Sequence, residues 1–308
     1  MKRILLTVAD RFFLLRPLVL VPAVTFFLLG HYDAREGVEQ GQGPFVIAAV
    51  FYAMLMGSVY VVNQISDIET DRANDKLFLL PKGIVKRREA VTASIVLAVH
   101  AVVGALVIGG RLPLYFILSL VLGLLYSVPP IALKRRFPFD LVANAIGYGI
   151  LAYSAGWVVV KGQGAQPDVW RAMPYALCVG AVFVLTALAD KEGDAKSGFR
   201  SAGVVLTLRG GTLLALCLVA LALPVALVVE NRIAAAGSLL ALPFFAFASL
   251  RVDPRSVRVA YRCSSAVFVL LVGVLHPLFL VVVLALLGLS RVYYSRRFAL
   301  DYPSVTGR

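Results

Sequence analysis

Residues 44–71 read PFVIAAVFYAMLMGSVYVVNQISDIETD, a nearly continuous apolar run that ends in the two acids Asp67 and Asp71. A helix that crosses the hydrocarbon core of a bilayer needs about 20 predominantly apolar residues, and this run meets that length. Carboxylates beside hydrocarbon are costly unless they face a partner. Acids at the end of a span therefore indicate a site that holds a cation.

The composition of the whole chain is that of an integral, multi-pass membrane protein. Of its 308 residues 60% are hydrophobic and 15% are charged, and the mean hydropathy is +0.87. This is more apolar surface than one soluble core can bury. Because lipid offers the backbone no partners, and the runs lack the alternation of barrel strands, we predict an all-α polytopic bundle that forms one domain over residues 1–308. About nine spanning helices are expected, over residues 13–31, 44–65, 91–108, 113–131, 139–160, 173–189, 212–229, 233–249 and 264–289.

The distribution of basic residues orients this bundle. If the spans alternate in direction, 21 of the 30 Lys and Arg residues fall on the face that bears the N-terminus, five fall in the opposite loops and four in the C-terminal tail. By the positive-inside rule the first face is cytoplasmic, and both acidic clusters lie on it. Nine spans place the basic tail on the other face, so either the tail is an exception or one span is misjudged. The net charge of +13 is spread through short loops, which fits anionic lipid, and we expect no nucleic-acid binding.

A second acidic cluster, DKEGD over residues 190–194, follows another apolar run and repeats the spacing of the first. Acids four apart share one face of a helix. Oxygen ligands without His or Cys suit Mg²⁺, which commonly binds a few carboxylates together with substrate phosphates. Basic residues adjoin both clusters, as a multiply charged phosphate requires; they include Arg72, Lys191 and Arg200. The alternative is that these acids only cap helix ends in solvated loops.

Four sequence elements together resemble the UbiA superfamily of intramembrane prenyltransferases. The first signature corresponds to Asn63-Gln64-x-x-Asp67-x-x-x-Asp71-Arg72, and the second to Asp190-x-Glu-Gly-Asp194-x-Lys-x-Gly. The segment YSVPPIALKR over residues 126–135 is similar to the tyrosine and lysine element of that family, and Leu15-Arg16-Pro17 to its N-terminal arginine motif. Ser201 stands where a Thr often follows the second signature.

The resemblance implies an enzyme that moves a prenyl group from an isoprenoid diphosphate to a lipophilic acceptor. Two Mg²⁺ ions would bridge the diphosphate, one side held by Asp67 and Asp71 and the other by Asp190 and Asp194. Asn63 would orient an acid or a substrate oxygen, and Tyr126 would contact the diphosphate or the carbocation. The expected substrate-binding residues are Arg16, Arg72, Lys134, Lys191, Arg200 and Asn144.

The acceptor and the function class have alternatives. The Asn-Gln form of the first signature favours an aromatic acceptor, with a glyceryl phosphate lipid as the second possibility. An ion-coupled transporter would also place carboxylates in a membrane. Against that class, the acids lie at one face rather than at the midplane, and the halves resemble a duplicated four-helix unit of parallel sense. No residue predicts the oligomeric state.

Overall fold

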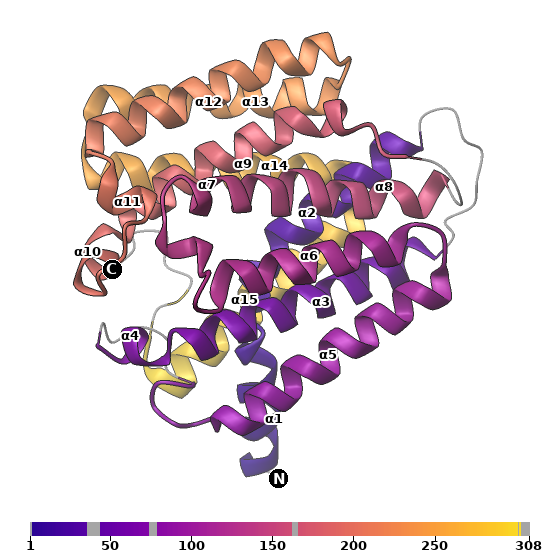
Figure 1. Cartoon of the computed structure of the whole chain (residues 1–308), viewed down its shortest axis with the longest axis vertical. Coiled ribbons are helices and arrows are strands. Elements are labelled where there is room, and N and C mark those ends of the chain that lie inside the picture. Colours follow the sequence, from indigo (N-terminus) through magenta and orange to yellow (C-terminus); the bar gives the residue numbers. More distant parts are fainter. Residues whose placement is uncertain (1, 36–43, 74–78, 162–165, 301, 303–308) are drawn as a thin grey trace.

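The computed structural model describes residues 2–35, 44–73, 79–161, 166–300 and 302. Over these ranges all regular elements are helical, which confirms the predicted all-α bundle (Figure 1). Nine of the described helical segments are long and apolar enough to cross a membrane, and a further apolar helix, α6, has 16 residues.

The long helices alternate in direction between the two ends of the bundle (Figure 1). They are α2 (Pro17–Ala34), α3 (Phe45–Ser66), α5 (Arg87–Ile108), α6 (Leu112–Ser127), the continuous segment α7 (Phe139–Asn144), η2 (Ala145–Ala152) and α8 (Tyr153–Lys161), α9 (Val169–Ala189), α12 (Leu208–Val228), α13 (Arg232–Arg251), α14 (Pro254–Leu275) and α15 (Pro277–Phe298). Short helices lie at one end: α1 (Lys2–Leu14), α4 (Ile68–Ala73), η1 (Leu133–Arg135), α10 (Lys191–Lys196) and α11 (Ala202–Val205).

The predicted span over residues 264–289 is wrong, because the chain breaks at His276 inside it. His276 has the non-helical angles φ −134° and ψ 80°, and Pro277 starts a new helix. Proline suits the first turn of a helix, where no backbone donor is needed. Two long helices, α14 and α15, therefore replace one predicted span.

The additional helix returns the C-terminal end of α15 to the face that bears the N-terminus. Arg297 of α15 donates to Asp10 of α1, with Nη2 to Oδ2 and Nε to Oδ1 distances of 3.2 Å each. Of the two explanations for the basic tail, the misjudged span is the correct one. The tail is not an exception to the charge rule.

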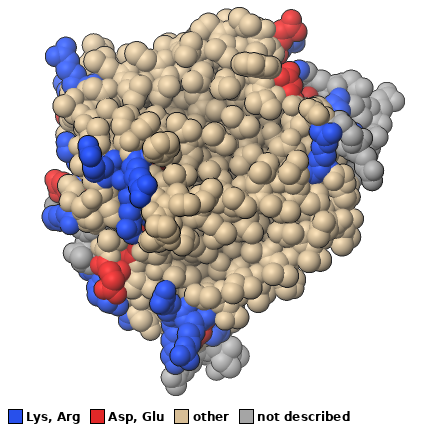
Figure 2. All heavy atoms as spheres, in the orientation of Figure 1, with Lys and Arg blue, Asp and Glu red and all other residues tan. Residues whose placement is uncertain are grey.

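The lipid-facing surface is a band of uncharged residues between two charged ends (Figure 2). Blue Lys and Arg spheres gather toward the left and lower edges, the side on which α4 and α10 lie, with a smaller charged group at the right (Figures 1 and 2). Large apolar side chains are exposed on the spanning helices, for example Val107 at 82% and Leu250 at 85%. In water such exposure would be unfavourable, whereas in lipid it is required.

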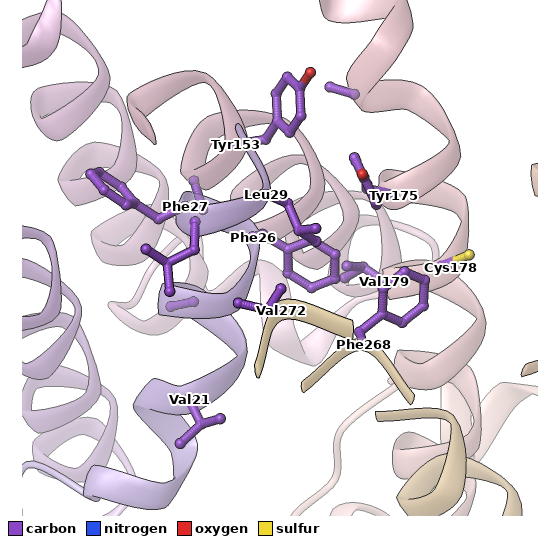
Figure 3. Close-up of a cluster of buried hydrophobic side chains, with 14 of the residues drawn as sticks. Val21, Phe26, Phe27, Leu29, Tyr153, Tyr175, Cys178, Val179, Phe268 and Val272 are labelled. Carbon is purple, nitrogen blue, oxygen red and sulfur yellow. The ribbon is translucent and has the colours of Figure 1, made fainter. Parts of the chain in front are cut away.

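Aromatic and small residues pack the inside of the bundle. Phe26 of α2 contacts Tyr175 of α9 and Phe268 of α14, with ring centroids 5.9 Å apart in both pairs (Figure 3). Helices α2 and α8 approach most closely at two glycines. A Cβ on Gly30 would lie 1.8 Å from the Tyr153 carbonyl oxygen, and one on Gly156 would lie 1.8 Å from the Phe27 carbonyl oxygen. Close backbone contact between small residues is a common way for membrane helices to associate.

We expect Gly156→Ala to destabilise the protein by about 3 kcal/mol, because the added methyl group overlaps backbone that cannot move aside cheaply. Gly288→Ala is the matched control, since a Cβ there meets no atom within 4 Å. That change should leave stability the same or raise it by up to about 1 kcal/mol through helix propensity. Thermal unfolding in detergent measures both, and equal midpoints for the two variants would contradict the close contact.

The ten-helix arrangement predicts that the C-terminal end and the start of α9 lie on opposite faces. In a background without the native cysteines, Tyr302→Cys and Trp170→Cys should react with a membrane-impermeant maleimide from opposite sides of oriented vesicles. Both positions are exposed, at 41% and 70%. If both cysteines react from the same side, the chain has nine spans and the extra crossing by α15 is wrong.

Candidate active site

A cavity of about 320 Å³ lies between the two acidic clusters. Its wall is polar near Asp67 and Asp190 and apolar beside Met56, Leu122 and Phe183. Met56 precedes Asn63 by seven residues on α3, so these two lining residues are roughly 10 Å apart along the helix axis. Eight of the predicted site residues line it: Arg16, Asn63, Asp67, Tyr126, Lys134, Asn144, Asp190 and Asp194.

The two acidic clusters have the same local structure. Asp67 terminates α3 and Asp190 terminates α9, and each is followed by a helix of six residues that bears the second acid. The backbone nitrogen of Asp71 donates to the Asp67 carbonyl at 2.7 Å, and that of Asp194 to the Asp190 carbonyl at 3.1 Å. One helical turn thus joins the two acids in each cluster, although the long helix itself stops at the first acid.

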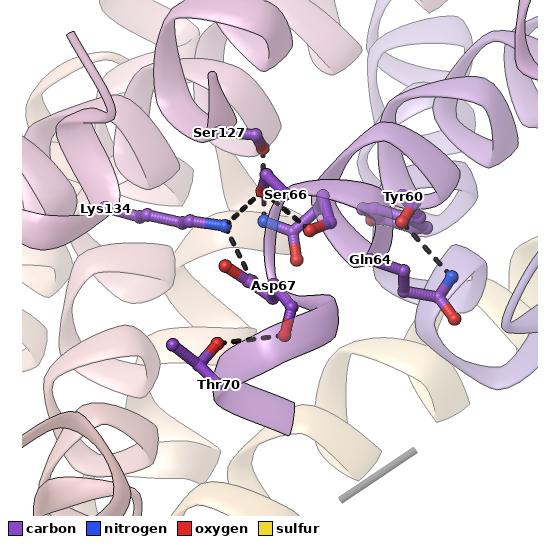
Figure 4. A network of polar contacts seen from close by, with 8 residues as sticks. Tyr60, Gln64, Ser66, Asp67, Thr70, Ser127 and Lys134 are labelled. Atoms are coloured by element: carbon purple, nitrogen blue, oxygen red, sulfur yellow. Dashed lines mark hydrogen bonds and ion pairs between the residues drawn. The ribbon is translucent and has the colours of Figure 1, made fainter. Parts of the chain in front are cut away.

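Lys134 binds the first cluster from the segment after α6. Its ammonium donates to Asp67 Oδ2 at 2.6 Å and to Ser66 Oγ at 2.9 Å (Figure 4). The side chains of Lys134 and Asp67 are only 8% and 16% exposed. Burial lowers the pKa of Lys134 from its ordinary value, and the neighbouring Asp67 carboxylate opposes that shift. The charge of this buried ammonium is therefore stabilised mainly by the Asp67 carboxylate, with the Ser66 hydroxyl as a second acceptor.

The donor set fits a hard cation that takes its remaining ligands from elsewhere. Asp67 Oδ1 is buried and accepts no hydrogen bond, so one carboxylate oxygen is available for a ligand. Within the described ranges, no three His, Cys, Asp or Glu residues converge on one point. A divalent ion held by one acid pair would need further oxygens, and a diphosphate can supply them.

The two amides of the first signature have different contacts. Asn63 Nδ2 donates to Ser127 Oγ of α6 at 3.1 Å, at the cavity wall. Gln64 is 3% exposed, and its Nε2 donates to the Leu14 carbonyl at 2.8 Å. Asn63 therefore lies in the site, while Gln64 fastens the end of α1 to α3.

Arg16 approaches the cavity from the corner between α1 and α2. It has φ 54° and ψ 60°, a left-handed conformation that non-glycine residues rarely adopt. Such strain concentrates at functional sites, where the surroundings hold it. Tyr60 of α3 and Tyr148 of η2 are hydrogen-bonded through their hydroxyl groups on the same wall.

Four predicted site residues do not line the cavity. Asp71 lies close enough to Lys134 to act on its charge. Arg72 donates to the Pro81 carbonyl and to Glu69, and its side chain is 55% exposed. Lys191 and Arg200 are exposed near the second cluster. The role of Asp71 in holding a metal, and those of Arg72, Lys191 and Arg200 in binding the substrate, stay predictions.

The second cluster is held by the loop of residues 200–202, through contacts that the sequence did not predict. Ser201 Oγ donates to Asp194 Oδ2 at 2.5 Å, and the next residue, Ala202, donates its backbone N–H to Asp140 Oδ2 at 2.6 Å. Asp140 is fully buried at the start of α7. The Arg200 backbone also exchanges hydrogen bonds with Arg135 and Phe137. This loop therefore joins the Lys134 segment to the second cluster.

The contacts of the serine residues around the acids were not predicted. Ser66 and Ser127 are isolated hydroxyl residues that carry little sequence signal, and Ser201 was noted only as standing in the place of a Thr. Ser66, Ser127 and Ser201 each contact a predicted site residue. Asn144, predicted to meet a substrate, lines the cavity and donates to the Asp140 carbonyl at 2.9 Å.

Comparisons with known proteins identify relatives of this chain. Residues 19–263 match the model of the UbiA prenyltransferase family. The chain is 30% identical over 148 residues to the bacteriochlorophyll synthase 34 kDa chain of Chloroflexus aurantiacus, a match that covers 48% of this chain and 47% of the relative. It is 28% identical over 171 residues to digeranylgeranylglyceryl phosphate synthase of Haloquadratum walsbyi, covering 52% and 54%. The chain thus spans about half the length of the curated relatives it matches.

The fold is also that of a solved structure. The structure of a UbiA homolog from Archaeoglobus fulgidus bound to GPP and Mg²⁺ superimposes with a TM-score of 0.65 at 21% identity. The superposition covers 85% of this chain and 98% of the homolog. At that identity the likeness establishes the fold, and it agrees with the polytopic helical bundle described above.

Ser201 offers a test of how the second cluster is held. Ser201→Thr keeps a hydroxyl at this position, whereas Ser201→Val, whose side chain has nearly the shape of threonine, removes it. Removing the hydrogen-bond donor to a metal-binding carboxylate typically weakens metal affinity about tenfold or more. The Mg²⁺ concentration that gives half-maximal thermal stabilisation by inorganic diphosphate should therefore rise only in the valine variant. Equal values for Thr and Val would show that the hydroxyl does not orient Asp194.

Proposed function

The chain belongs to the UbiA prenyltransferase family, and we propose that it is a Mg²⁺-dependent intramembrane prenyltransferase. The donor would be an isoprenoid diphosphate, the acceptor a lipophilic aromatic molecule, and the products a prenylated acceptor and diphosphate. Family membership favours this enzyme over the ion-coupled transporter that the sequence also allowed.

One observation carries the proposal: a cavity of about 320 Å³ has carboxylates of both clusters, Lys134 and Arg16 at its polar end and apolar side chains farther in. A prenyl diphosphate has the same division into a charged head and an apolar tail. Sites for such ligands combine an apolar wall with a few placed polar groups.

The residues of the polar end would bind and ionise the donor. Arg16 and Lys134 lie in the wall and would donate to diphosphate oxygens. Asp67 and Asp71 would hold one Mg²⁺ ion and Asp190 and Asp194 a second, and the bound ions would neutralise the charge that develops on the leaving group. The allylic carbon–oxygen bond breaks, and its electron pair leaves with the diphosphate.

The aromatic residues of the wall would protect the carbocation that remains. Tyr60, Tyr126 and Tyr148 line the cavity, and aromatic rings stabilise cations through their negative faces. Apolar neighbours such as Met56 and Phe183 would exclude water, which would otherwise convert the cation into an alcohol. An acceptor carbon or oxygen within bonding reach would then form the new bond to the cation, and the proton that this atom carried would leave to the released diphosphate or to solvent.

An aromatic acceptor is favoured over a glyceryl phosphate lipid by two observations. The first signature has the Asn-Gln form, and the 30% identical relative is named as the bacteriochlorophyll synthase 34 kDa chain. The lipid acceptor stays the second candidate because the 28% identical relative is a digeranylgeranylglyceryl phosphate synthase.

The site would face the cytoplasm. The end that bears the acidic clusters also carries most of the basic loop residues, and the corrected path of α15 adds Arg296 and Arg297 to it. By the positive-inside rule this end stays on the cytoplasmic side. A soluble diphosphate product would then leave into the cytoplasm, while the prenylated acceptor stays in the membrane.

Asp67→Asn and Asp190→Asn should each lower turnover about a hundredfold or more. Each removes a carboxylate that would hold a metal ion against the charge developing on the leaving diphosphate. The assay measures Mg²⁺-dependent release of diphosphate from GPP by the purified protein in vesicles. Asp253→Asn is the control, since Asp253 caps α14 and asparagine caps helices equally well. If the wild-type protein releases no diphosphate from donors of any chain length, the proposed prenyltransferase activity is wrong.

The acceptor is tested with the same protein by competition. An aromatic ring acceptor and a glyceryl phosphate ether lipid are offered together with labelled donor, and the labelled product is identified by mass spectrometry. We expect the label on the aromatic acceptor. If only the ether lipid carries the label, the acceptor is a glyceryl phosphate lipid and not an aromatic molecule.

A further inference from the structure

The two ends of the described chain meet at one buried carboxylate. Asp10 of α1 is 6% exposed. Its carboxylate accepts a hydrogen bond from the Tyr293 hydroxyl at 2.6 Å. It also accepts a bidentate pair of hydrogen bonds from Nε and Nη2 of Arg297, at 3.2 Å each. Bidentate guanidinium–carboxylate contacts fix orientation as well as distance. The end of α1 and the end of α15 are therefore held in a defined arrangement.

Aromatic stacking reinforces that contact. The Phe13 ring lies parallel to the Tyr293 ring, with centroids 3.8 Å apart and an angle of 9° between the planes. Tyr294 meets Phe13 edge-on at 5.6 Å. We call Asp10, Phe13, Tyr293 and Arg297 the terminal clasp. All four residues of the terminal clasp lie outside residues 19–263, the part of the chain that matches the family model.

The terminal clasp lies next to Arg16 along the chain and in space. Arg16 donates its backbone N–H to the Phe13 carbonyl at 3.0 Å, so the stacked residue is also a direct backbone partner of the arginine. On the side of α15, Phe13 stacks on Tyr293, and on the side of the cavity Arg16 lines the same wall as Tyr148. Arg16 thus stands between the C-terminal helix and the candidate active site.

The conformation of Arg16 needs such support. Its left-handed backbone is unfavourable for a residue with a Cβ, and it persists only where neighbours hold it. The Gln64 amide holds the corner from the side of α3 through the Leu14 carbonyl. The terminal clasp holds the preceding turn of α1 from the side of α15. The corner is therefore fastened on two sides, and the side chain enters the cavity from it.

We propose that Asp10, Tyr293 and Arg297 are positioning residues that hold Arg16 in place to bind the donor diphosphate. This role rests on the proposed function, because it assigns the diphosphate to the cavity. It makes α15 a support of the active site as well as a membrane-spanning helix.

The first experiment measures donor KM and kcat for GPP with the full-length protein in vesicles. Asp10→Asn, Tyr293→Phe and Arg297→Gln should each raise donor KM, by roughly tenfold for the two charge removals, because small displacements of a binding group are expensive. The value of kcat should change little if Arg16 binds ground state and transition state alike. Arg297→Lys should restore part of the affinity, and Asp253→Asn should match the wild type.

A double-mutant cycle separates positioning of Arg16 from a general loss of structure. If the terminal clasp acts through Arg16, Asp10→Asn should raise donor KM by less than about twofold in a protein that already carries Arg16→Gln, because coupled residues are not additive. Full additivity would overturn the proposal, as would an unchanged donor KM in Asp10→Asn. A wild-type protein without turnover would instead overturn the proposed function, and the assigned role of the clasp with it.

Discussion

Hydrocarbon forces every spanning segment of this protein to satisfy its backbone internally, and that requirement decides where chemistry can occur. Inside a helix the N–H and C=O groups are consumed by the helix itself, so polar function moves to the places where helices stop. Arg16 precedes α2, Asp67 and Asp190 end α3 and α9, and Lys134 lies in η1 beyond α6. The cavity is lined where these four helix ends converge.

Charged side chains at such ends need partners before any substrate arrives. Asp67 and Lys134 bind each other at 2.6 Å, which lowers the cost of holding either charge at the edge of an apolar medium. Asp140 is completely buried, and two backbone N–H groups, those of Leu141 and Ala202, donate to it. Lys134 and Ala202 lie in segments that follow spanning helices, so the charges that these two residues contact order those segments.

Sequence patterns predicted the bundle and eight of the residues that line the cavity, because the spans follow from composition and the acid pairs from short spacing. Apolar runs of sufficient length identify spans directly, and four-residue spacing identified the acid pairs. The patterns missed the break at His276, since hydropathy continues across it and a proline in the first helical turn resembles a proline within a helix. They also could not distinguish Arg72, which turns to Glu69 and Pro81, from Arg16, which enters the cavity. That difference depends on backbone direction at a helix end, which side-chain identity does not encode.

The two acidic clusters share one local structure but differ in how they are held, and the difference affects what a ligand must displace. Asp67 is held by the Lys134 ammonium, whereas Asp194 accepts from the Ser201 hydroxyl. A diphosphate attracts an ammonium as strongly as a carboxylate does, so it competes with Asp67 for Lys134. It has no comparable attraction for a neutral hydroxyl that is 3% exposed and anchored through Ala202 to Asp140. If the cavity binds a diphosphate as proposed, the ligand would exchange partners at the first cluster, where Asp67 and Lys134 bind each other.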